Sequence, residues 1–190
     1  MKPDFQRDLI PSDDALHLIG ALNAMKDRLL NAAHQWELLD ESGHVPAAPS
    51  YTALLQHAAD AQDLSRDVLQ LTADFARSPH RTTRAGGIVL SHLATAATMS
   101  SHAAPHFTET AESALALPRS ANPTDRHYLT NRMVIDHASA RGFLRRTSES
   151  LRDAVKELDD HLGFQRFLST LTRRESPPAP PPPRPGGRHR

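Results

Sequence analysis

Apolar residues recur at alternating spacings of three and four along most of the chain, and this pattern divides it into four long segments. The first repeat follows Ser12 and two aspartates, a combination that suits a helix N-terminus. It then runs without a break through Ala15, Leu18, Leu22, Met25, Leu29, Ala32, Trp36 and Leu39. Such a heptad stripe is typical of helices that pack nearly parallel or antiparallel. We therefore expect one long helix that ends before the polar, proline-containing stretch 41–50.

The next two segments have clear punctuation. Ser50 can cap a second helix, and Pro79 should stop it because proline disfavours helix at the residue before it. A third repeat spans residues 89–117 after two adjacent glycines at 86 and 87. Its middle is nearly all small residues, which favours close approach by a neighbour. Pro105 lies inside this repeat and predicts a kink, because it removes one backbone donor.

The fourth segment begins at Asn122 and Pro123, a favoured pair for the first positions of a helix. Its second half carries the clearest apolar seam, which consists of Leu144, Ser148, Leu151, Val155, Leu158 and Leu162. Gly163 follows as a candidate C-terminal residue of this helix. A short amphipathic helix over residues 164–171 is then expected to fold back.

Four helices joined by short loops predict an all-α, up-down-up-down four-helix bundle, since no alternating β-branched pattern persists. We expect a flexible N-terminus over residues 1–11 and the bundle domain over 12–172. The last stretch, 173–190, is rich in proline and arginine and predicts a disordered basic tail.

The composition narrows the chemistry. The 190 residues include no cysteine, which excludes disulfides, thiolate metal sites and thiol nucleophiles. Together with the lack of a signal peptide and of a membrane-spanning apolar run, this favours a cytoplasmic, soluble protein. The formal net charge is zero but uneven, since residues 1–75 carry 5 basic and 12 acidic side chains and residues 173–190 carry 5 and 1.

Histidines supply the first candidate site. In an antiparallel hairpin that turns near residue 120, His102 and His106 lie level with the turn that contains His137, with Asp136 beside it. Two histidines one turn apart and a third from a facing helix are a sensible ligand set for a divalent metal. We interpret them as partly exposed structural histidines and predict no cofactor, with a divalent metal bound by them as the alternative.

A second candidate is nuclease chemistry. The segment from Arg132 to His137 resembles the R-x4–6-H pattern of HEPN ribonucleases, which are also helical bundles. The resemblance implies that Arg132 and His137 would act on the scissile phosphate and the ribose hydroxyl. Met133 replaces the polar residue that usually follows the arginine in that family.

The tail is the third candidate. Residues 174–180 fit R-x-x-P-x-x-P, a polyproline ligand pattern, so Arg174, Pro177, Pro180 and Arg184 are candidate partner-binding residues. The alternative is a solubilising terminus. Nucleic acid is not an expected ligand, because the basic residues lack interleaved aromatics. Since no segment requires a particular reaction, we expect a non-enzymatic interaction or scaffold protein, which binds a protein partner or a second copy.

Overall fold

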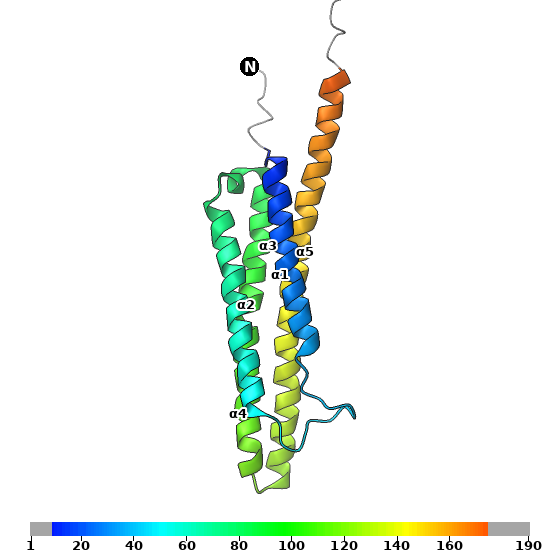
Figure 1. The fold of residues 1–190 in the computed structure, drawn as a ribbon. Helices are drawn as coiled ribbons and strands as arrows, with labels where there is room; N and C mark the ends of the chain where they lie inside the picture. Colours follow the sequence, from blue (N-terminus) through cyan, green and yellow to red (C-terminus); the bar gives the residue numbers. More distant parts are fainter. Residues whose placement is uncertain (1–8, 175–190) are drawn as a thin grey trace, which may run out of the picture.

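The computed structural model of the chain describes residues 9–174, and this part is all-α, with no strand in the described range (Figure 1). The prediction of an all-α protein is confirmed. The helices are α1 (Ser12–Gln35), α2 (Tyr51–Arg77), α3 (Arg84–Ser101), α4 (Ala103–Ala116) and α5 (Pro123–Arg174). Two short 3-10 turns, η1 (Pro79–Thr82) and η2 (Leu117–Arg119), lie in the connections. In this described part, no helix combines the length and the apolar character needed to cross a membrane.

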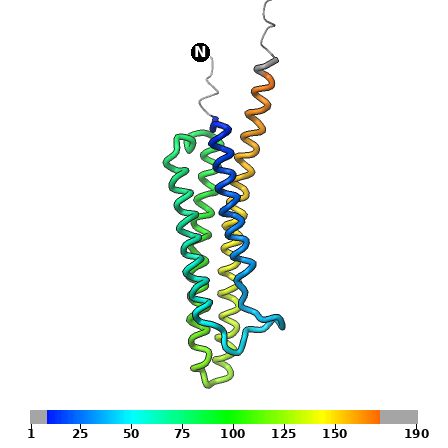
Figure 2. The backbone as a smooth tube through the Cα atoms, viewed as in Figure 1, coloured from blue at the N-terminus to red at the C-terminus, as the bar shows by residue number. Residues whose placement is uncertain are grey.

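Helix α5 is the longest element and organises the molecule. It packs against α1, α3 and α4, whereas α2 packs against α3 and α4 on the other side (Figure 2). The predicted stripes supply the core, in which Leu22, Leu29, Val68, Leu93 and Leu151 are all fully buried. Heptad spacing thus directs these residues inwards where the helices pack against one another.

The boundaries of α2 confirm the sequence pattern. The Ser50 side chain accepts a hydrogen bond from the backbone N–H of Ala53, and the helix ends at Arg77, before Pro79. Thr83 caps α3 in the same way by accepting from the N–H of Gly86. Gly86 is required there, because a Cβ at this position would lie 1.9 Å from the carbonyl oxygen of His80.

Helix α1 is shorter than its apolar stripe suggests. It ends at Gln35, and Trp36 adopts an extended conformation. The Arg141 guanidinium on α5 donates a 2.6 Å hydrogen bond to the carbonyl oxygen of Ala33, which otherwise lacks an intrahelical partner. The chain then leaves the helix, and Leu38 is buried in a separate small cluster with Leu54, Ala111, Ala114 and Met133.

The third predicted segment forms two helices with a break at His102. Pro105 is the third residue of α4, a position where its missing N–H costs no hydrogen bond. Close packing across the small residues brings the Ser65 and Ser100 hydroxyls within 3.2 Å. The predicted interruption is present, although it lies one turn before the proline.

Helix α5 corrects the prediction for the C-terminal part. It runs through Gly163 to Arg174, so the separate short helix expected over 164–171 is a continuation of α5. Glycine ends a helix only where the backbone turns left-handed, and among the described residues Gly43 alone has a positive φ. In Figure 1 this last part of α5 extends beyond the ends of the other helices.

The start of the described chain is held against the bundle at Ile10, which belongs to the stretch 1–11 that was predicted to be flexible; residues 1–8 lie outside the described part. Ile10 is buried in the core, with 1% of its surface exposed. Its backbone N–H donates to Nε2 of His161 at 3.1 Å, and its carbonyl oxygen accepts from the Gln165 side chain. Ser12 also donates to Gln165 instead of capping α1.

Candidate functional site

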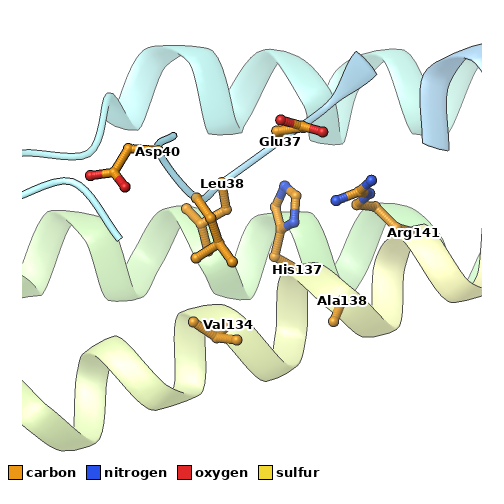
Figure 3. Close-up of a pocket in the computed structure, with 8 residues that line it drawn as sticks. Glu37, Leu38, Asp40, Val134, His137, Ala138 and Arg141 are labelled. Carbon is orange, nitrogen blue, oxygen red and sulfur yellow. The ribbon is translucent and has the colours of Figure 1, made fainter. Parts of the chain in front are cut away.

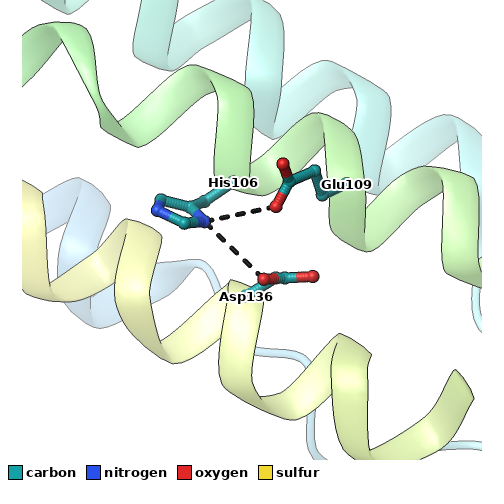
Figure 4. A group of neighbouring side chains, drawn as sticks. All are labelled: His106, Glu109 and Asp136. Carbon is teal, nitrogen blue, oxygen red and sulfur yellow. Dashed lines mark ion pairs between the residues drawn. The ribbon is translucent and has the colours of Figure 1, made fainter. Parts of the chain in front are cut away.

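Of the three histidines predicted as metal ligands, His106 is the one whose donor atom converges with those of two other ligand-type side chains in the described part of the chain. Nδ1 of His106, on α4, lies 3.5 Å from Oε2 of Glu109 and 3.6 Å from Oδ1 of Asp136, on α5 (Figure 4). The three donor atoms all lie within 4.8 Å of one another. In the described part of the chain, His102 and His137 belong to no such group, so the structure does not bring the three predicted histidines together.

Neighbouring side chains hold this His106 group in place. The Phe143 ring stacks on the His106 imidazole, with centroids 5.5 Å apart and planes 12° from parallel. His102 contacts the same Phe143 ring, and its own side chain is exposed. Nε of Arg132 lies 3.4 Å from Oδ2 of Asp136, which leaves Oδ1 directed at His106.

His137 lies on the next position of α5 and points elsewhere. Its ring meets Phe107 edge to face at 5.3 Å and lies 6.4 Å from the His57 ring, which stacks on Trp36. The pKa of His137 is lowered to about 4, chiefly by burial, with smaller contributions from the Arg141 guanidinium and from the neighbouring His57 ring. Burial also lowers the pKa of His57. Both imidazoles are therefore neutral at neutral pH.

A small cavity adjoins His137. Its volume is about 200 Å³, and its lining includes Glu37, Leu38, Val134 and Arg141. Figure 3 shows His137 and Arg141 projecting from α5 towards the segment that carries Glu37 and Leu38. Nε2 of His137 is buried without a hydrogen-bond partner. The side chain is 3% exposed, so the ring forms part of the protein interior rather than an open site.

This placement bears directly on the resemblance to HEPN ribonucleases. Arg132 is exposed and pairs with Asp136, whereas His137 is buried among aromatic rings. A nuclease site would need both side chains to reach one phosphodiester. The two residues do not share an accessible surface, so the geometry gives the nuclease hypothesis no support.

No protein family, no curated protein and no solved structure matches the chain. The arrangement of its own residues therefore carries the functional argument.

A second candidate site lies at the opposite end of α5. Phe164, Phe167, Leu168 and Leu171, which we call the α5 stripe, recur at helical spacing along one side of the helix. Phe164, Phe167 and Leu171 are 54%, 58% and 43% exposed. The stripe continues into a groove of about 530 Å³ whose lining includes Leu9, Ala85, Glu157 and His161. The helix expected over residues 164–171 was predicted to fold back on the bundle, so the exposed stripe was not predicted.

The tail residues predicted to bind a partner are mostly beyond this region. Arg174 is the last residue of α5. Pro177, Pro180 and Arg184 lie outside the described residues, and so does the predicted disordered segment. The polyproline interpretation of residues 174–180 stays a prediction.

Proposed function

We propose that the chain is a non-enzymatic interaction or scaffold protein that associates with a second copy of itself through the end of α5. In this proposal the helices form an up-down-up-down four-helix bundle, with α3 and α4 as one kinked member. The supporting contacts are those of α5 with α1, α3 and α4, and those of α2 with α3 and α4. The bundle would then serve as a rigid base for the projecting helix.

The α5 stripe is the observation that carries the proposal. Two exposed phenylalanines and an exposed leucine on one helical face cost free energy in water, about 25 cal/mol for each Å² of apolar surface. Spacings of three and four are those by which two helices interlock. A two-fold dimer would use the same stripe on both copies, because its interface is self-complementary.

Charge along α5 favours an antiparallel arrangement of the two copies. Residues 149–160 carry five acidic and two basic side chains, whereas residues 161–174 carry three arginines and no acidic residue. Two copies that cross near Phe164 in antiparallel orientation bring the basic segment of each against the acidic segment of the other. A parallel pair would place like charges together, which is unfavourable. The same crossing lays Leu171 of one copy over the groove of the other.

The size of the stripe sets the expected strength. Four partly exposed side chains of this kind bury roughly 400 Å² per copy, about half of the ~800 Å² per partner in a standard interface. The groove must supply part of the remainder. We therefore expect a dimer with a dissociation constant in the micromolar range.

Sedimentation of the metal-free full chain over a range of concentrations tests this function. The parent chain should pass from monomer to dimer as concentration rises. Phe167→Glu should weaken the dimer by at least about tenfold, because burying a carboxylate among apolar side chains costs more than 1.4 kcal/mol. Leu69→Glu is the matched control, since Leu69 on α2 is 59% exposed but lies outside the stripe.

Three outcomes would overturn the proposal. One is a Phe167→Glu variant that self-associates as the parent does, and another is a parent that stays monomeric throughout. The third is a chain that dimerises only when residues 1–8 are removed, which would identify these residues as the occupant of the groove.

A further inference from the structure

Three side chains with metal-binding chemistry converge between α4 and α5, far along the molecule from the α5 stripe (Figures 1 and 4). His106 and Glu109 are one turn apart on α4, and Asp136 faces them from α5. Their side chains are 31%, 43% and 12% exposed, so the group lies at the edge of the interior with solvent access on one side.

The His106 imidazole carries a second observation, which concerns its hydrogen bonding. Its Nδ1 atom is buried and makes no hydrogen bond. The two carboxylate oxygens lie 3.5 and 3.6 Å away, too far for a well-formed hydrogen bond. A buried polar atom without a partner costs about 1–3 kcal/mol, so native structures rarely leave one unexplained.

We propose that His106, Glu109 and Asp136 bind a divalent transition metal of the zinc class. Bonds of about 2.0–2.1 Å in a tetrahedral arrangement place donor atoms about 3.3 Å apart. The two separations that involve Nδ1 exceed this value by only about 0.2–0.3 Å. A metal ion between the three donors would satisfy the buried nitrogen and both carboxylates once the Glu109 and Asp136 oxygens, which lie within 4.8 Å of each other, approach to the same separation.

The donor set decides the class of metal. Imidazole nitrogen is a preferred ligand of zinc, iron and nickel, whereas magnesium and calcium prefer oxygen alone. Three protein donors leave one tetrahedral position for water or another exchangeable ligand. The partly exposed Glu109 side lets such a ligand enter from solvent.

The surroundings of the group match those of metal ligands. Arg132 binds the outer oxygen of Asp136, and Phe143 covers one face of the His106 ring. Contacts of this kind orient ligand atoms and are part of metal sites. The positive charge of Arg132 opposes the cation in part, which sets a limit on affinity.

Zinc titration of the untagged full chain, stripped of metal and in competition with a chromophoric chelator, tests the site. One equivalent of Zn²⁺ should bind tightly. Glu109→Gln and Asp136→Asn should each weaken binding at least about tenfold. Glu109 is 43% exposed at its side chain, so its substitution should leave the fold intact, which circular dichroism checks.

Three variants sharpen the result. His17→Ala, on the exposed side of α1, controls for the loss of one surface histidine and should bind zinc as the parent does. His102→Ala and His137→Leu should also keep the site, because neither belongs to the converging group.

An ion pair between His106 and the two carboxylates, without a metal, is the competing explanation. It predicts no stoichiometric zinc, or zinc binding that Glu109→Gln and Asp136→Asn leave unchanged, and either result would overturn the metal site. The dimer is measured on metal-free protein, so failure of the metal site would not affect the proposed self-association.

Discussion

The two ends of α5 distribute polar and apolar side chains in opposite ways. Near its beginning, Asp136 and His137 are 9% and 3% exposed and lie among helices α2 and α4 and the chain after α1. Near its end, Phe164 and Phe167 are more than half exposed. Burying ionisable groups and exposing phenyl rings both cost free energy. Each end therefore departs from what folding alone favours, and each of our two proposals rests on one of these departures.

The largest expected effect comes from truncating two phenylalanines, one buried beside His137 and one exposed in the α5 stripe. Phe107 is fully buried between Trp36 and His137, so Phe107→Ala should lower the free energy of unfolding by about 3–5 kcal/mol. Phe167→Ala removes the same atoms from a ring that is 58% exposed. Its effect on the monomer should stay within about 0.5 kcal/mol. Denaturant titration at low protein concentration measures both.

One result would contradict this expected difference between Phe107→Ala and Phe167→Ala. If Phe167→Ala costs several kcal/mol at a concentration where the chain is monomeric, the ring is part of the monomer's own core. The α5 stripe would then be unavailable to a second copy. A Phe167→Ala effect that grows with protein concentration is the result that self-association requires.

Low pH should lower the stability of the fold through His137, which is buried near the beginning of α5. Its pKa is about 4 in the folded protein and about 6.5 in an unfolded chain, so the unfolded state binds more protons between these values. The stabilisation is complete above pH 6.5 and is lost as the pH falls towards 4. The loss is up to about 3 kcal/mol. His57, whose pKa is also lowered by burial, acts in the same direction.

Substitution of His137 isolates this contribution. His137→Leu removes both the titrating ring and its unpartnered Nε2, so the variant should lose less stability than the parent between pH 7 and pH 5. Unfolding free energies at several pH values check it. His17→Leu, at an exposed position on α1, is the control and should keep the parent's pH dependence. Parallel pH profiles for the parent and His137→Leu would contradict the assignment.

Much of the helical architecture was predictable because heptad spacing and proline positions are local signals. Ser50 and Pro79 bound α2 as expected. The errors came where tertiary contacts decide. Arg141 ends α1 from 108 residues away along the chain, and no local pattern announces that contact. Gly163 was a misleading stop signal, because α5 continues through it and Gly163 itself has no left-handed φ.

The candidate metal site was half predictable. Counting back from the hairpin turn correctly placed His106 level with the turn of α5 that contains Asp136 and His137. It could not tell which of the two faces α4, because consecutive helical residues point about 100° apart. Glu109 was overlooked, although a carboxylate three residues from a histidine lies on the same helical side. The exposed stripe was missed because amphipathic spacing looks the same whether its partner is in the chain or outside it.

The smallest expected effect concerns the hydrogen bonds that hold the N-terminal segment against the end of α5. The Gln165 side chain donates to the carbonyl oxygen of Ile10 and accepts from the Ser12 hydroxyl, so this otherwise apolar end also has a polar contact. Gln165→Ala should lower the free energy of unfolding by about 1 kcal/mol, since the Ile10 N–H keeps its bond to His161. Hydrogen exchange should quicken at Ile10 and leave α4 unchanged.

Gln56→Ala, at an exposed glutamine of α2 bonded only to Asp60, is the control and should change stability by less than about 0.5 kcal/mol. Equal effects of the two variants would mean that Ile10 is held by burial alone, and exchange that quickens throughout α4 would mean that the two ends unfold as one unit.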